Sequence, residues 1–113
     1  MNLRSAADVV MVVTTLPNDT AATALARALV EEQLAACVNI VPGVRSIYRW
    51  EGAVADEPEI VCLVKTARDR LERLSARLRE LHPYSVPELL VLSPSDGAQA
   101  YCDWVIESTR GSS

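Results

Sequence analysis

The alternation of apolar and polar positions along the chain predicts a regular succession of strands and helices. Residues 8–15 have a continuous apolar centre, which is typical of a strand buried on both faces. A turn follows over 16–19, where Asn18 or Asp19 can accept a hydrogen bond from the first turn of a helix. That helix runs to about Gln33 and carries its apolar residues on one face.

The middle of the chain predicts a long β-hairpin. Two extended runs rich in Val and Ile, 36–51 and 54–66, are separated by a short turn. Pro42 cannot donate to a strand ladder and Gly43 relaxes the backbone, so we expect a bulge or bend at this pair.

The last third of the chain adds a helix, a strand and a further helix. Thr66 with Asp69 approximates a capping box for a helix that ends at His82. A short apolar strand follows over 88–93, and a final helix over 95–108.

The element order is therefore β-α-β-β-α-β followed by a helix. Two βαβ halves of this kind predict an α+β fold of the ferredoxin-like, split β-α-β type. In such a fold an antiparallel sheet carries its helices on one face. We expect Tyr101, Trp104 and Val105 of the final helix to face inward.

Length and composition favour a single domain. The chain has 113 residues, of which half are hydrophobic, enough to bury a core without a disulfide framework or a structural metal. We expect one domain over 1–113 with an ordered core of about 8–108. Only the two ends, 1–7 and 110–113, have loose sequence patterns.

Charge and cysteine usage exclude several classes of protein. The net charge of -4 argues against a broad nucleic-acid interface. Cys37, Cys62 and Cys102 are widely spaced, and no CxxC pair indicates a closed zinc site, so no obligatory cofactor is expected. The apolar run 9–13 is too short for a membrane span or a signal-peptide core. These features together predict a cytoplasmic protein.

The predicted hairpin is too long for one domain to cover. An arm of about fifteen residues reaches about 50 Å, whereas a chain of this size has a width of roughly 35 Å. The hairpin must bend, overhang the body, or both. Its far half carries apolar side chains that need cover: Val44, Ile47, Tyr48, Trp50 and Val54.

We expect the overhang to lie on another copy of the same chain. Burying two aromatic side chains there gives a gross gain of several kcal/mol, at about 25 cal/mol per Å². Tyr48 and Trp50 would pack on the neighbour, and Arg45 and Arg49 would meet its carboxylates. The alternative is a hairpin that curls back over its own helices.

Several stretches together resemble the CutA divalent-cation-tolerance family. They cover nearly the whole chain: LPND (16–19), LVEEQLAACVNIVPGVRSIYRWEG (29–52), EIVCLVKT (59–66), LHPYSVPELLVL (81–92) and YCDWV (101–105). The resemblance implies a ferredoxin-like fold assembled as a tight homotrimer, with long strands that engage neighbouring subunits. It also implies an association with copper and other divalent metals.

Two residues are candidate metal ligands. His82 is the only histidine, and imidazole binds copper or zinc well. Cys37 could supply a thiolate suited to Cu(I). The alternatives are a histidine that merely ends a helix and a cysteine buried as a small hydrophobe. Some copper-binding relatives have a further cysteine near the end of the first strand, where this chain has Thr14.

A second group of polar residues is expected at the cleft between subunits that the family resemblance implies. Its members are Trp50, Glu59, Lys65, Tyr84 and Glu88. Convergent groups of these types could hold a small anion or a metal complex, or move protons. They could equally form an interfacial network that fixes the register of the trimer.

These features lead to three hypotheses about function. The first is a non-catalytic homotrimer that binds copper or other divalent metal ions in metal tolerance, with itself and metal ions as partners. The second is a signalling or regulatory trimer that binds a small anionic ligand in the cleft. The third and weakest is an enzyme that uses His82 or Lys65 there, because the chain has no nucleophile elbow, phosphate loop or HExxH motif.

Overall fold

The computed structural model describes residues 1–111, so the end of the tail expected to be loose, 112–113, lies outside the described residues. The elements in chain order are β1 (Leu3–Ser5), β2 (Val9–Leu16), α1 (Asp19–Glu31), β3 (Cys37–Trp50), β4 (Ala53–Ala67), the 3-10 turn η1 (Arg68–Arg70), α2 (Leu71–Leu81), β5 (Leu90–Leu92), β6 (Asp96–Ala98) and α3 (Gln99–Ser108). None of the helices in this described part is long and apolar enough to cross a membrane.

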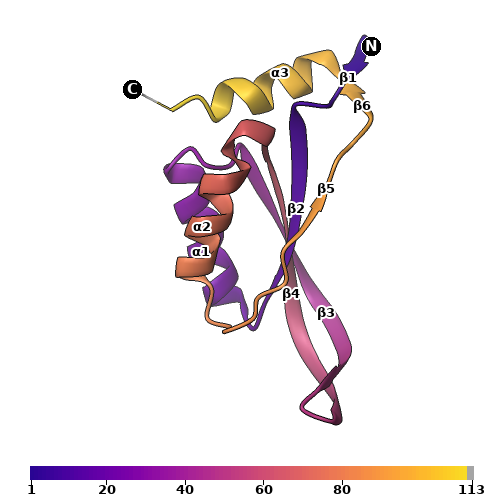
Figure 1. The fold of residues 1–113 in the computed structure, drawn as a ribbon, viewed down its shortest axis with the longest axis vertical. Helices are drawn as coiled ribbons and strands as arrows, with labels where there is room; N and C mark the ends of the chain where they lie inside the picture. Colours follow the sequence, from indigo (N-terminus) through magenta and orange to yellow (C-terminus); the bar gives the residue numbers. More distant parts are fainter. Residues whose placement is uncertain (112–113) are drawn as a thin grey trace.

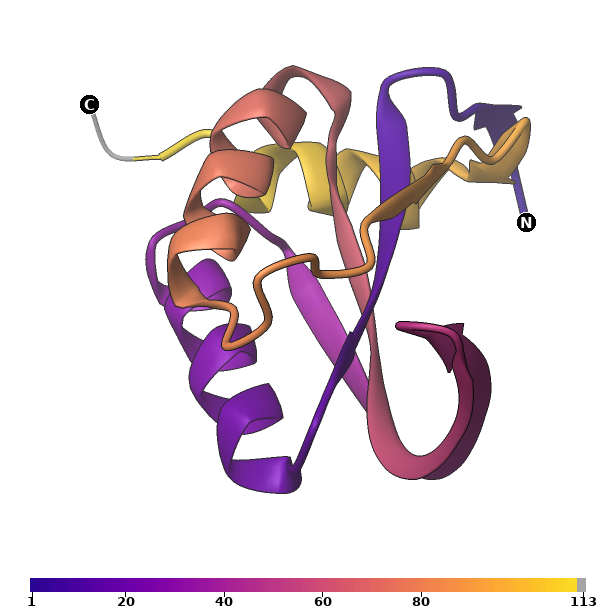
Figure 2. The same cartoon turned by 60° about the horizontal axis from the view of Figure 1, so that its bottom comes forward.

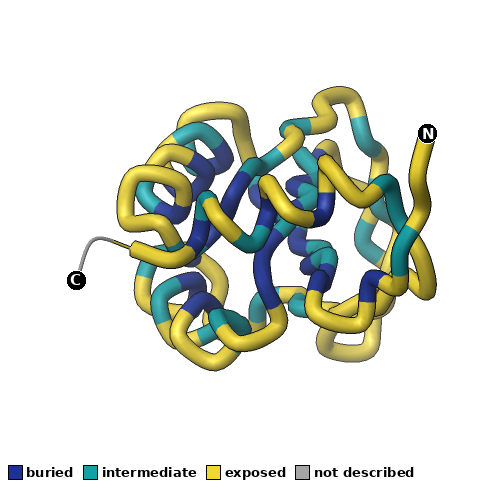
Figure 3. Tube along the Cα trace, turned by 90° about the horizontal axis from the view of Figure 1, so that it is seen from above, coloured by how far each residue is buried: buried dark blue, intermediate teal, exposed yellow. Residues whose placement is uncertain are grey.

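The main sheet has the order β3-β4-β2-β5 and is antiparallel throughout. Helices α1 and α2 cover one face of it (Figure 1). Because side chains alternate along a strand, Val12 and Val64 point towards these helices and pack with Leu25 and Leu74. Seen from above, the buried segments lie between the helices and the sheet (Figure 3). The predicted ferredoxin-like α+β fold is confirmed.

The opposite face of the sheet is only partly covered. Helix α3 crosses one end of it, where Val105 packs with Val9 and Ala36 (Figure 1). Beyond α3 the apolar residues of this face remain open: Leu90 is 61% exposed and Leu92 is 47% exposed. We call the part of the sheet that carries Met11, Val13, Leu63, Leu90 and Leu92 the open face.

The predicted hairpin forms a ribbon of β3 and β4 that extends well beyond the body of the molecule (Figure 1). The register shifts between Val41 and Val44, which places the expected bulge at Pro42 and Gly43. Gly43 has a φ of +74°, a conformation that glycine adopts without strain. The ribbon curves at its tip and does not lie over α1 and α2 (Figure 2), so the curled-back alternative is wrong.

Three local predictions are wrong. Thr66 does not cap a helix, because the residues that precede η1 and α2 are Ala67 and Arg70 and neither start has a side-chain cap; the Thr66 hydroxyl instead donates to the backbone oxygen of Leu34 at 2.6 Å. Tyr101 and Trp104 contact each other with their rings tilted by 38° but are 44% and 45% exposed, while Val105 is buried as expected. The N-terminal residues are not loose, because β1 pairs with β6.

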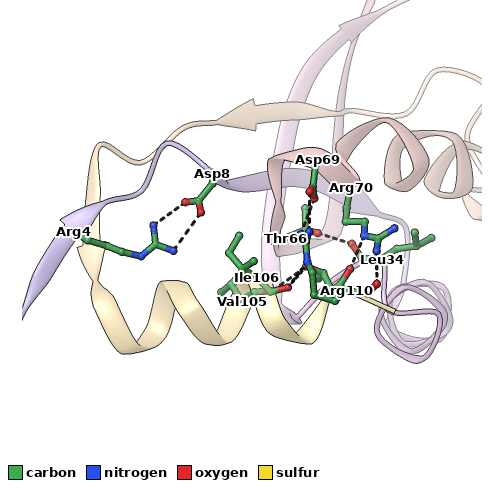
Figure 4. A network of polar contacts seen from close by, with 10 residues as sticks. Arg4, Asp8, Leu34, Thr66, Asp69, Arg70, Val105, Ile106 and Arg110 are labelled. Atoms are coloured by element: carbon green, nitrogen blue, oxygen red, sulfur yellow. Dashed lines mark hydrogen bonds and ion pairs between the residues drawn. The ribbon is translucent and has the colours of Figure 1, made fainter. Parts of the chain in front are cut away.

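Arginine side chains fasten α3 to the rest of the fold (Figure 4). Arg70 donates from Nε to the backbone oxygen of Thr109 at 2.5 Å, which satisfies a free carbonyl just beyond the helix. Arg110 forms paired bonds of 2.8 and 2.9 Å with Asp69 of η1. The hydrogen bonds from Arg110 hold the pKa of Asp69 below its ordinary value of 3.8.

Candidate functional site

A pocket of about 720 Å³ lies where the ribbon leaves the body. One wall comes from the outer half of β3, another from β4 and the end of β2, and a third from the loop between α2 and β5. Its lining residues are Thr15, Ser46, Ile47, Tyr48, Trp50, Glu59, Pro83, Tyr84, Ser85, Val86 and Glu88. We call this the ribbon pocket. Its volume lies within the range of small-molecule sites, about 300–1,000 Å³.

A hydrogen bond between Tyr84 and Glu59 forms the inner part of the ribbon pocket. The Tyr84 hydroxyl donates to Oε2 of Glu59 at 2.8 Å, and the Glu59 residue is only 8% exposed. Burial and this carboxylate raise the pKa of Tyr84, so the phenol stays protonated and keeps its role as donor. Glu59 therefore presents a largely buried carboxylate whose second oxygen, Oε1, forms no hydrogen bond with the described residues.

His82 supports the ribbon pocket from behind. Its Nε2 lies 2.8 Å from the backbone oxygen of Thr15, so it must donate there, and its Nδ1 accepts the backbone N–H of Tyr84 at 3.1 Å. The imidazole is therefore neutral, buried and occupied at both nitrogens. A metal ion could bind it only after one of these hydrogen bonds had broken.

Cys37 and Lys65 lie together at the other end of the sheet. They are directly opposite each other in the β3–β4 register, and both contact the side-chain oxygen of Asn39, the Cys37 Sγ at 3.9 Å. Lys65 lies six positions beyond Glu59 in β4, about 20 Å along a strand. The thiol also neighbours Tyr101, whose pKa is raised by burial and by Cys37.

Position 14 cannot take part in a metal site with Cys37. Thr14 is fully buried and lies opposite Cys62 in the β2–β4 register, under the helices. Cys37 instead points to the other side of the sheet, the side of the open face. A donor at position 14 would be separated from Cys37 by the sheet itself.

The predicted site residues therefore separate into two places. Trp50, Glu59, Tyr84 and Glu88 line the ribbon pocket with Tyr48, whereas Lys65 and Cys37 do not. Within residues 1–111 no group of three or more His, Cys, Asp or Glu side chains is arranged to hold a metal ion.

Of the residues predicted at a subunit interface, Arg45 already has a partner within its own chain. It forms paired bonds of 2.8 and 2.6 Å with Asp56 across the ribbon, which hold the pKa of that carboxyl below its ordinary value. Tyr48 and Trp50 are 41% and 51% exposed, so neither is covered by the chain's own core.

Sequence reasoning missed the part of the ribbon pocket formed by small and neutral residues. Thr15, Ser46 and Ser85 carry no chemistry that would single them out. Val86 is 70% exposed and lies between Pro83 and Pro87. An apolar side chain in a loop that contains two prolines and several polar residues is the one signal in the sequence that could have indicated this part of the pocket.

Comparison with known proteins gives one consistent result. The model of the "CutA1 divalent ion tolerance protein" family matches residues 10–108. The divalent-cation tolerance protein CutA of Thermus thermophilus is 48% identical over 99 residues, which cover 88% of this chain and 96% of that protein. The chloroplastic protein CutA of Arabidopsis thaliana is 43% identical over 101 residues, covering 89% of this chain and 56% of its own length.

A solved structure gives the same result in three dimensions. The CutA structure from Synechococcus elongatus superposes with a TM-score of 0.92 at 42% sequence identity. The superposition covers 96% of each chain, so it includes the ribbon and α3 as well as the sheet.

Proposed function

The chain belongs to the CutA1 divalent ion tolerance family, and from this premise we propose that it acts as a cytoplasmic, non-catalytic homotrimer. In this proposal the trimer binds copper or other divalent metal ions and takes part in the response to them. Residues 1–113 form the single domain of each subunit. Other copies of the chain and metal ions are its partners, and no cofactor is obligatory.

The observation that carries the proposal is the apolar surface that one chain leaves uncovered. It has two parts, the open face with Leu90 and Leu92 and the ribbon tip with Tyr48 and Trp50. A soluble monomer rarely leaves contiguous patches of this kind exposed, and a ribbon of two strands is marginal by itself. Closed symmetry covers every ribbon with a neighbouring copy.

Cys37 is the metal ligand that the geometry favours. It is a free thiol, only partly buried, on the side of the sheet that the trimer would cover. His82 is disfavoured because both of its ring nitrogens form hydrogen bonds. Since one chain offers no group of three donors among its described residues, the remaining ligands would come from neighbouring copies.

Metal titration of matched variants tests this assignment. The purified protein is titrated with Cu(I), Cu(II) and Zn(II), the first without oxygen, beside Cys37→Ser and His82→Ala. We expect Cys37→Ser to weaken Cu(I) binding by about tenfold or more, because a thiolate is the softest donor available. We expect His82→Ala to bind each metal within about threefold of the parent, and to unfold at a lower temperature.

Circular dichroism of each variant separates lost binding from lost folding, and Cys37→Ala serves as a second variant without the hydroxyl. The assignment would be wrong if both Cys37 variants folded and bound every metal as tightly as the parent. Loss of metal binding in a well-folded His82→Ala variant would show that the His82 imidazole is a metal ligand.

A further inference from the structure

Assembly of the proposed trimer covers two opposite charges that have no counter-charge in their own chain. One is Glu59 in the ribbon pocket, which is 8% exposed and whose Oε1 forms no hydrogen bond with the described residues. The other is Lys65, the only lysine of the chain, which lies beside Met11 of the open face. We propose that these two charges pair between copies, so that the Lys65 ammonium of one copy binds the Glu59 carboxylate of the next. This inference rests on the proposed trimer and names the contact that completes its interface.

Both side chains lie on the side of the sheet that the trimer covers. Alternate residues of a strand point the same way, and the extra residue of the β3–β4 bulge lies in β3, so positions 59, 61, 63 and 65 of β4 share one side. Lys65 is directly opposite Met11 in the β2–β4 register, and Leu63 is opposite Val13. Glu59 and Lys65 therefore mark the two ends of one surface that begins in the ribbon pocket and continues along the open face.

The two charges cannot meet within one chain. About 20 Å of strand separates them, far beyond the reach of a lysine side chain. Lys65 hydrogen-bonds to the neutral side chain of Asn39, and within residues 1–111 it has no carboxylate partner. Glu59 accepts a hydrogen bond from the neutral hydroxyl of Tyr84. Each charge therefore has a hydrogen bond but lacks a counter-ion.

Covering these charges without pairing them would oppose assembly. A charge that is buried loses its hydration, which is strongly unfavourable unless an opposite charge replaces the lost water. In a closed ring with head-to-tail contacts, each copy offers Lys65 to one neighbour and Glu59 to the other. Three identical pairs then form and neither charge is left over. The pairs also fix how far each ribbon extends along the neighbouring open face.

Arg49 is the competing cation, because it too has no carboxylate partner among the described residues. It lies between Tyr48 and Trp50 in β3, so its side chain points to the opposite side of the ribbon from these two pocket residues. Its guanidinium is exposed and can keep its hydration at the edge of an interface. Lys65, on the covered surface, depends on a counter-ion more strongly.

Carbodiimide cross-linking of the native protein tests the contact, because this reagent joins an amine to a carboxylate that touches it. Lys65 supplies the only side-chain amine of the chain. We expect covalent dimers and trimers on a denaturing gel, and mass spectrometry of their peptides should place the new amide between Lys65 and Glu59. Lys65→Arg keeps the positive charge but cannot form this amide, so it should assemble normally and give no cross-link through position 65.

A double-mutant cycle gives an independent measurement that does not require the reagent to enter the interface. Dissociation of the trimer is followed by sedimentation equilibrium in increasing urea for Lys65→Met, Glu59→Gln and the double variant. Each single change should raise the dissociation constant about tenfold or more, because it leaves the opposite charge buried alone. The double variant should be no weaker than the weaker single variant. Arg79→Met, which removes an exposed cation of α2, should leave the dissociation constant unchanged.

Three results would overturn the pairing while leaving the trimer in place. These are a cross-link from Lys65 to a different carboxylate, additive effects of the two changes, and coupling of Glu59→Gln to Arg49→Met instead of Lys65→Met. Circular dichroism shows that each variant compared is folded. A folded parent chain that sediments as a monomer would instead contradict the proposed function itself.

Discussion

The hydrogen bonds of His82 fix its imidazole as neutral, with the proton on Nε2. They join the end of β2 to the loop that carries Tyr84, so the histidine positions one wall of the ribbon pocket. The sequence shows that this histidine ends a helix next to a proline. It does not show which backbone groups face the ring, because Thr15 comes from a strand 67 residues earlier.

Removing this imidazole should cost stability. His82→Ala leaves the Thr15 carbonyl and the Tyr84 N–H without their partner, and an unpaired buried group costs about 1–3 kcal/mol. We expect the free energy of unfolding, measured with urea, to fall by about that amount. Arg79→Ala, an exposed change on the same helix, should stay within about 0.5 kcal/mol of the parent. Equal stabilities in the two variants would contradict the structural role of His82.

At the scale of elements, periodicity predicted the main strands and helices well, because β2, α1, α2 and the inner half of β4 each bury a regular apolar face. The predictions that failed concern residues whose local structure depends on partners far away in the sequence. Thr66 has a hydroxyl that suits a cap, but it donates to the carbonyl of Leu34, and the N-cap of α2 is Arg70. The short strands β1 and β6 stabilise each other across the length of the chain, and neither has a pattern of its own.

Ion pairs between elements predict how stability depends on pH. Asp69, paired with Arg110, has a folded-state pKa below its ordinary value of 3.8. Such a group stabilises the fold above that value and loses its contribution as the pH falls through the folded-state pKa. We expect Asp69→Asn to lower the free energy of unfolding at pH 7 by at most about 1 kcal/mol, since the pair is largely exposed.

The difference between Asp69→Asn and the parent should shrink towards zero when unfolding is measured near pH 2, where the carboxyl is protonated in both states. Glu107→Gln, which removes an exposed carboxylate of α3 away from the ribbon, is the matched control and should not differ from the parent at either pH. A deficit in Asp69→Asn that stayed constant with pH would mean that the side chain acts by packing and not by charge.

At the scale of the whole molecule, the ribbon and the open face have the same cause. One chain of this length makes more β-structure than its helices can cover, and its extents of 47 × 30 × 21 Å reflect the overhang. The sequence predicted this excess from strand lengths alone. It could not place Cys37 and Lys65 away from the ribbon pocket, because that depends on the register between β3 and β4.

The mass of the native chain in dilute solution tests the assembly most directly. Sedimentation equilibrium over a wide range of concentrations should give three times the 12.3 kDa of one chain, with Trp50 shielded from an aqueous fluorescence quencher. A particle of 12.3 kDa that stayed folded, with its ribbon still ordered, would contradict the claim that copies of the chain cover one another's exposed β-structure.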